Sequence, residues 1–149
     1  MSNEQVRTVT EPWQKPWPSI DADNEDFWEG LKQHKLLLWR CKTCGAWYWP
    51  KAYCRSHENE EFMGNLAWEE ASGKGKVFSF NVHHWAFHPA FKDELPYVYA
   101  IVETDEGPMI SSTIVDVDPK DVKVGMPVRI VYEDHPNDGF TIPRWGPER

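Results

Sequence analysis

Apolar and polar residues alternate over short segments from residue 66 to the end of the chain, and glycine or proline separates these segments. Alternation with a period of two is typical of β-strands that bury one face. We expect strands over residues 66–72, 77–85, 97–104, 109–117, 128–133 and 140–145. Because Pro143 cannot donate a ladder hydrogen bond, we expect the last strand at a sheet edge. The pattern predicts a mainly β fold that ends in a five-stranded Greek-key barrel of the OB type.

The N-terminal segment has a different composition. Residues 1–22 contain three prolines (Pro12, Pro16 and Pro18), which exclude a helix there. They also contain Trp13 and Trp17, which are too apolar for a free tail. We therefore expect an extended arm that lies across this protein or a partner.

A short helix is predicted after the arm. Asp23 or Asn24 can cap its N-terminus, and Phe27, Trp28 and Leu31 share one apolar face. We assign residues 23–62 to this helix and a zinc ribbon, and residues 63–149 to the OB barrel.

All three cysteines of the chain lie in one stretch, together with a histidine at matching spacing. Cys41 and Cys44 form one i, i+3 pair, and Cys54 and His57 form a second. Two such turns facing each other can hold one tetrahedral Zn²⁺ with three thiolates and one neutral imidazole. Gly45 follows the first pair, where a positive φ is often needed. The spacing therefore predicts a Cys3His zinc ribbon.

Other interpretations of this stretch stay open. A redox dithiol would place its Cys-x-x-Cys at the start of a helix, whereas β-prone residues follow Cys44. A disulfide would need an oxidising compartment and usually an even number of cysteines. His34 or a water molecule could replace His57 as the fourth ligand. Four protein ligands leave no open coordination position, so we expect the zinc to be structural.

Charge is distributed unevenly along the chain. The formal net charge is −8, yet residues 31–57 contain six basic residues and no Asp or Glu. The rest of the chain holds 10 Lys and Arg against 24 Asp and Glu, a formal −14. A basic island of this kind attracts phosphates or an acidic partner surface, or is simply a solvated face. The acidity of the whole chain argues against general nucleic-acid binding.

The compartment follows from what the sequence does not contain. The first residues are polar, and the longest apolar run is only Leu36–Trp39. We therefore expect neither a signal peptide nor a membrane span. An odd cysteine count agrees with a reducing environment, so we expect a cytoplasmic protein.

Short motifs in a fixed order resemble one protein family. The N-terminal half of the resemblance consists of Phe27-Trp28, Leu37–Arg40, Cys41-x-x-Cys44-Gly45, Pro50 and Cys54. The C-terminal half consists of Ser72-Gly73-x-Gly75-x-Val77, Pro96-Tyr97, Gly107 and Val124-Gly125-Met126-Pro127-Val128. Over about residues 23–145 the chain thus resembles the acyl-CoA-associated zinc-ribbon/OB-fold proteins catalogued as domain of unknown function 35. The fourth metal ligand of that family is usually cysteine, whereas this chain has His57.

The resemblance implies an N-terminal helix, a rubredoxin-like zinc ribbon and a C-terminal OB barrel. It also implies a partner, because the family is similar to small subunits of complexes with thiolase-fold enzymes, acyl-CoA hydratases or aldolases. Our hypothesis is an auxiliary subunit of a thiolase-type complex that cleaves a carbon–carbon bond of a β-ketoacyl-CoA. The nine tryptophans hint at an aromatic acyl group, although interface packing explains them equally well.

No catalytic residue is expected in this chain itself. If zinc holds all three cysteines, no thiol is left as a nucleophile for acyl transfer. The chain would instead stabilise the catalytic subunit and help to shape its CoA site. We expect contacts with CoA or with the partner at Lys42, Trp47, Trp49, Lys51 and Arg55.

Two other functions fit parts of the sequence. OB barrels and zinc ribbons also bind single-stranded nucleic acids or proteins, but the barrel segment of this chain is rich in acids. A free-standing hydratase or hydrolase would depend on His83, His84 and His88. Adjacent strand residues point to opposite faces, so His83 and His84 cannot serve one pocket without a bulge. These histidines otherwise belong to a loop or an interface.

Overall fold

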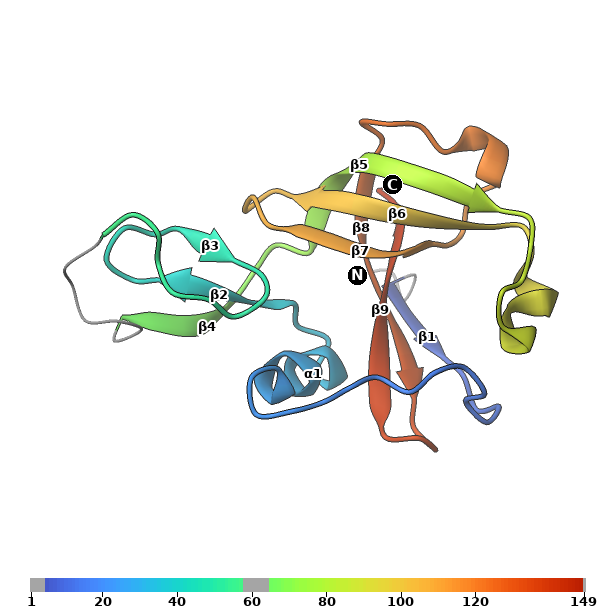
Figure 1. The fold of residues 1–149 in the computed structure, drawn as a ribbon, viewed down its shortest axis with the longest axis horizontal. Helices are drawn as coiled ribbons and strands as arrows, with labels where there is room; N and C mark the ends of the chain where they lie inside the picture. The colour runs from blue at the N-terminus through green and yellow to red at the C-terminus, as the bar shows by residue number, and fades with distance from the viewer. Residues whose placement is uncertain (1–4, 58–64, 149) are drawn as a thin grey trace.

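The structure, a computed structural model, describes residues 5–57 and 65–148. Two β-sheets flank one α-helix in the described part of the chain (Figure 1). The larger sheet has the strand order β1-β8-β5-β6-β7-β9, and β8 also pairs with β9, which closes a barrel. The smaller sheet has the order β3-β2-β4. No helix in the two described ranges has the length and apolar character needed to cross a membrane.

Five strands form the barrel and confirm the predicted mainly β, OB-type architecture. They are β5 (Lys74–His83), β6 (Tyr97–Thr104), β7 (Met109–Ile114), β8 (Pro127–His135) and β9 (Phe140–Pro147). Short 3₁₀ helices at Pro89–Glu94 (η2) and Pro119–Asp121 (η3) interrupt the connections. The inward side chains are largely β-branched, as suits a pleated and buried surface. Those that are at most 1 % exposed include Val77, Val98, Val102, Val128 and Trp145.

The expectation that the last strand lies at an edge is wrong. β9 pairs antiparallel with β8 from Phe140 to Pro147 and meets β7 where Ile114 lies opposite Trp145. Because β7 pairs with β9 only near Trp145, the ladder on that side needs no N–H from Pro143. The Pro143 carbonyl instead accepts a hydrogen bond from the Ser112 hydroxyl at 2.5 Å.

The ribbon consists of β2 (Leu37–Cys41), β3 (Trp47–Tyr48) and β4 (Leu66–Glu70). The predicted domain boundary at residue 63 assigns residues 66–70 to the barrel. In the structure β4 pairs antiparallel with β2, with Trp68 opposite Trp39. The chain passes into the barrel only afterwards, through Gly73, whose φ is +74°.

The helix α1 (Glu25–Lys32) lies between the ribbon and the β8–β9 hairpin (Figure 1). The side chains of Phe27 and Leu31 are 3 % and 0 % exposed, so the predicted apolar face of the helix is buried. Asn24 occupies the N-cap position, but its side chain bonds backward to the Asp21 N–H at 2.8 Å instead of capping the helix. A Cβ at Gly30 would lie 2.7 Å from Leu37 Cγ, so a glycine there allows the close approach of α1 to the ribbon.

The arm lies across this chain's own barrel. Its strand β1 (Val6–Thr8) pairs in parallel with β8, and the Val9 N–H donates to the Asp134 carbonyl at 2.8 Å. Further along, the rings of Trp13 and Trp17 each pack edge-on against Phe140 at 5.2 Å. The arm therefore adds a strand and an aromatic cover to one side of the β8–β9 hairpin.

Candidate metal centre

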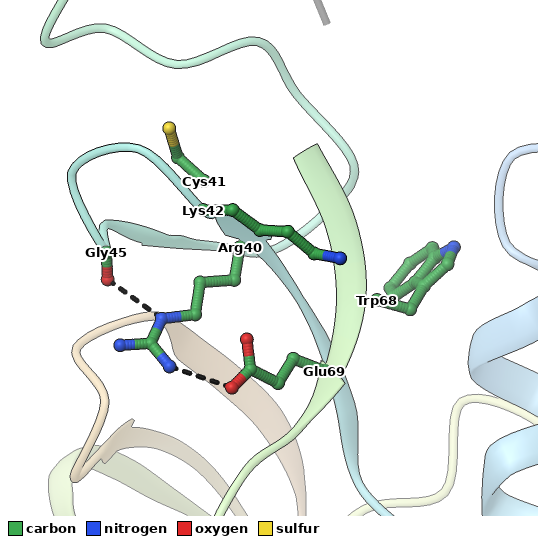
Figure 2. A pocket seen from close by; sticks show the side chains of 6 residues that line it. All are labelled: Arg40, Cys41, Lys42, Gly45, Trp68 and Glu69. Carbon is green, nitrogen blue, oxygen red and sulfur yellow. Dashed lines mark hydrogen bonds and ion pairs between the residues drawn. The ribbon is translucent and has the colours of Figure 1, made fainter. Parts of the chain in front are cut away.

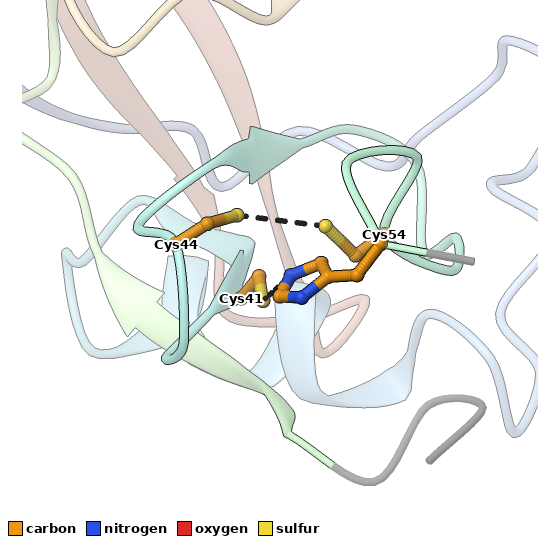
Figure 3. A group of neighbouring side chains, drawn as sticks. Cys41, Cys44 and Cys54 are labelled. Carbon is orange, nitrogen blue, oxygen red and sulfur yellow. Dashed lines mark hydrogen bonds between the residues drawn. The ribbon is translucent and has the colours of Figure 1, made fainter. Parts of the chain in front are cut away.

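Two tight turns bring the three cysteines and one histidine together at the end of the ribbon (Figure 3). Their potential ligand atoms all lie within 4.8 Å of one another. The Cys41 Sγ lies 3.3 Å from the His57 Nε2, and the Cys44 Sγ lies 3.5 Å from the Cys54 Sγ. The i, i+3 spacing thus produces the predicted convergence of four ligand atoms.

Backbone hydrogen bonds shape the first turn. The Gly45 N–H donates to the Cys41 carbonyl at 2.8 Å, and the Cys41 N–H donates to the Ala46 carbonyl at 2.9 Å. Gly45 has a φ of +78°, a conformation that is costly for residues with a Cβ. The glycine therefore lets β2 reverse within a few residues and carries Cys44 back toward Cys41.

The surroundings of the sulfurs act unequally on their ionisation. The Tyr48 hydroxyl donates to the Cys54 Sγ at 3.5 Å and, with the Ser56 N–H, lowers the pKa of Cys54 to about 6. The backbone N–H of Cys44 lowers the pKa of Cys41. At Cys44 the Ala46 N–H lowers the pKa, but burial and the two neighbouring sulfurs outweigh it, so the net pKa is raised. The surroundings thus favour the thiolate form at Cys41 and Cys54 and disfavour it at Cys44, where a bound cation would act against the raised pKa.

The donor set fits zinc. With Zn–S near 2.3 Å and Zn–N near 2.0 Å, a tetrahedral site separates two sulfurs by about 3.8 Å and sulfur from nitrogen by about 3.5 Å. The Cys44–Cys54 and Cys41–His57 separations of 3.5 Å and 3.3 Å are close to these values. His34, the alternative fourth ligand, pairs instead with Asp134 at 2.8 Å, on the barrel.

A cavity of about 480 Å³ opens beside the first turn and is lined by Arg40, Lys42, Trp68 and Glu69, among others (Figure 2). Arg40 spans it, because its Nη1 lies 2.8 Å from Glu69 Oε1 and its Nε donates to the Gly45 carbonyl at 3.2 Å. Its guanidinium also lies 4.5 Å from the centre of the Trp47 ring. The sequence analysis did not select Arg40 as a contact residue, although it directly precedes Cys41 within the basic stretch of residues 31–57.

The residues predicted to contact CoA do not form one patch. Trp39 and Arg40 are neighbours in β2 and point to opposite faces. Lys51 lies 4.9 Å from the Trp39 ring, whereas Trp47 lies under Arg40 on the other face.

The other two candidates also have distinct surroundings. Arg55 lies 5.8 Å from the ring of Tyr48, which pairs with Trp39. Trp49 packs at 4.1 Å against Phe27 of α1, so its ring takes part in the core between helix and ribbon. Lys51 and Arg55 therefore share a face, and Trp49 has a packing role.

His83, His84 and His88, the histidines considered for catalysis, occupy separate positions. His83 ends β5 and stacks on Tyr97 at 4.7 Å with an angle of 5° between the rings. His88 caps η2 by accepting a hydrogen bond from the Ala90 N–H at 3.2 Å. His84 is exposed just beyond the end of β5. This arrangement does not gather them into a catalytic group.

A zinc ribbon followed by an OB barrel, with a helix packed between them, defines a recognised class of protein, and family models match both parts. Residues 28–60 match the rubredoxin-like zinc ribbon domain of ChsH2, and residues 68–133 match its C-terminal OB-fold domain. A DUF35 domain-containing scaffold protein of Methanocaldococcus jannaschii is 39% identical over 118 residues, which are 75% of this chain and 78% of that protein. The chain belongs to the DUF35 family of zinc-ribbon/OB-fold proteins.

Other relatives are parts of acyl-CoA enzymes by name. A probable enoyl-CoA hydratase alpha subunit of Thermomonospora curvata is 38% identical over 76% of this chain, which spans only 34% of that protein's length. The solved structure of the Ltp2-ChsH2(DUF35) aldolase contains a similar chain, with 33% identity and a TM-score of 0.74. The similarity covers 88% of this chain and 98% of that one.

Proposed function

We propose that this chain is a non-catalytic, zinc-binding scaffold subunit of an acyl-CoA-processing complex. The observation that carries the proposal is the convergence of all three cysteines of the chain on one Cys3His cluster. A metal held by Cys41, Cys44, Cys54 and His57 would cross-link the two turns and leave no thiol for acyl transfer. The covalent chemistry would then belong to a partner subunit.

The partner that we propose makes or breaks a carbon–carbon bond of an acyl-CoA, as a thiolase-type enzyme does. The similarity to the chain in the Ltp2-ChsH2(DUF35) aldolase supports an enzyme of carbon–carbon chemistry. The hydratase subunit of Thermomonospora curvata favours a second candidate, a partner that hydrates an enoyl-CoA. In both cases the role of this chain is to hold and complete another subunit.

The basic face of the ribbon is the proposed contact with CoA. Lys51 and Arg55 lie over the rings of Trp39 and Tyr48 on the same face. Cations held on aromatic rings offer their charge to phosphates and an apolar surface beside it. Lys42, exposed just after β2, adds a further cation to the ribbon beside the Arg40 cavity.

Purification of the tagged chain from its native cell tests the proposal. We expect an acyl-CoA lyase or hydratase to copurify in a fixed ratio, and the isolated chain to contain about one zinc and show no turnover. Acyl-CoA turnover by the isolated chain, or a complex that lacks an acyl-CoA enzyme, would contradict the proposal.

The same complex tests the CoA contact. In the double variant Lys51→Glu/Arg55→Glu we expect the KM for the CoA substrate to rise about tenfold with little change in kcat. Lys120→Glu is the matched control, because that side chain is 84% exposed on the barrel. If the double variant and the control had the same KM, the CoA contact would have to lie elsewhere. The proposed scaffold role would be unaffected.

A further inference from the structure

A buried polar cluster lies on the outer face of the β8–β9 hairpin, beneath the arm. Glu133 and His135 are 8 % and 3 % exposed, on the face opposite to the core residues Ile130 and Tyr132. The Glu133 carboxylate accepts two hydrogen bonds from Arg144, at 3.2 and 3.3 Å. Arg144 also donates to the Thr113 hydroxyl at 3.0 Å. The two charged groups of the cluster are therefore paired, as buried charges must be.

The histidine of the cluster has one satisfied nitrogen and one that is not. His135 Nε2 lies 2.8 Å from Glu133 Oε1. Burial acts to raise the pKa of Glu133, but the combined lowering by Arg144 and His135 is larger. The net pKa therefore lies below its ordinary value. An ionised carboxylate can only accept, so Nε2 carries a hydrogen, and in the neutral form of the ring Nδ1 is then an acceptor. Nδ1 is buried and has no hydrogen-bond partner among the described residues.

Aromatic contacts hold the imidazole in place. Trp13 of the arm packs edge-on at 4.8 Å, and Phe140 lies at 5.3 Å. The contact between His135 Nε2 and Glu133 Oε1 restrains the ring as well. Nδ1 is therefore a rigid acceptor whose direction is set in advance, which lowers the entropy lost when a donor binds.

A cavity adjoins this ring. It has a volume of about 360 Å³ and is lined by His135, by apolar Val9, Pro12, Trp13 and Ala90, and by the polar arm residues Glu11, Gln14 and Lys15. That volume falls within the usual range for small-molecule sites. The other unpaired buried polar atom in the described chain, Trp145 Nε1, belongs to a fully buried side chain of the barrel core. Within the described ranges, His135 therefore has an unpaired buried atom and also lines this cavity.

The surroundings define the chemistry of a ligand. Lys15 is already paired with Glu94 at 2.6 Å, and Arg144 is paired with Glu133, so these cations offer no free charge to an anion. The apolar wall favours a compact, flat body, and the free acceptor requires a donor. We propose that this cavity binds a small neutral molecule with an apolar ring and one O–H or N–H group, which donates to His135 Nδ1.

Phenol and benzene are a matched pair of probes for the full chain. They share a ring, but only phenol carries a donor. With the histidines labelled with ¹⁵N, we expect phenol to shift the His135 Nδ1 resonance in a saturable way and leave His83 unchanged. Phenol should bind about tenfold more tightly than benzene, as expected for one hydrogen bond to a buried acceptor.

Variants separate the acceptor from the wall. His135→Phe keeps an aromatic ring but cannot accept, so phenol and benzene should bind with equal affinity. Trp13→Ala keeps the acceptor and removes part of the wall, so both probes should weaken while their affinity ratio stays near ten. If His135→Phe fails to fold, the wild-type ratio and Trp13→Ala still decide the question. Equal affinities in the wild type, no binding of either probe, or an Nδ1 already bonded to a fixed water would overturn the proposal.

Discussion

The ribbon and the barrel are both small β-structures, but different forces stabilise them. The barrel closes its own hydrogen-bond ladder and surrounds a continuous apolar core that includes the fully buried Trp145. The ribbon has three strands of five, two and five residues, and most of its side chains stay half-exposed. Three short strands rarely bury enough apolar surface to fold alone. We therefore expect the ribbon to depend on a bound metal and on the packing of α1, whereas the barrel closes through the pairing of its own strands.

Loss of a metal ligand should give the largest separation between the two regions. In Cys41→Ser we expect zinc content to fall from about one to near zero and the ribbon to unfold. The bound metal of a small zinc domain contributes about 10 kcal/mol or more to its folding. Hydrogen exchange should show rapid exchange over residues 37–57 and continued protection over β5–β9.

Ser56→Ala is the control for this variant, because the Ser56 backbone N–H that contacts Cys54 Sγ is retained. Equal loss of protection in the ribbon and the barrel would show that the two regions fold as one unit and would remove the contrast.

Removing a buried charge from the barrel should have the next largest effect. In Glu133→Gln the Arg144 guanidinium loses its ionised partner, and we expect the free energy of unfolding to fall by about 3 kcal/mol. Thermal or urea unfolding measured on barrel signals gives this value. Glu103→Gln is the control, because its contact with Lys76 at 3.5 Å is on the surface and should contribute less than about 1 kcal/mol.

The same pair of variants carries a pH test. Because the folded-state pKa of Glu133 is lowered, its stabilisation is present above the ordinary glutamate pKa and is lost as pH falls through that value toward the folded-state pKa. The difference in stability between wild type and Glu133→Gln should therefore shrink on acidification below about pH 4.5. A difference that grows at low pH would contradict the assigned ion pair.

A substitution at the junction should have the smallest effect. In Gly73→Ala the new Cβ would lie 2.8 Å from Ile130 Cγ2, in a residue whose φ is +74°. We expect the barrel to lose about 1–3 kcal/mol, with zinc content unchanged. Gly125→Ala is the control, because its φ is +86° but nothing lies within 4 Å of the added atom. Equal losses in the two variants would mean that backbone strain, not contact with the barrel, matters at the junction.

Local signals in the sequence led to the strands and the metal cluster. The alternation at residues 97–104 matches β6 to the residue, because an antiparallel strand with one buried face records its environment in its own side chains. The cluster of Cys41, Cys44, Cys54 and His57 followed from spacing, because each turn is built by its own backbone.

Long-range pairing was beyond the reach of such signals. Leu66–Glu70 has the composition of a strand, but its choice of β2 as partner depends on the whole ribbon. The pairing of β1 with β8 and the burial of Glu133 and His135 beneath the arm join residues more than a hundred positions apart. A strand pattern states which face is buried but not what covers it.

The sequence by itself determined the approximate positions of the barrel strands and which four side chains can share a metal, since both depend on residues close in the chain. Only the tertiary structure decided that Lys51 and Arg55 share a ribbon face, that Trp49 is used in packing, and that His135 keeps an unpaired nitrogen beside a cavity. These outcomes depend on contacts between distant segments, whose free energies are set by the folded geometry as a whole.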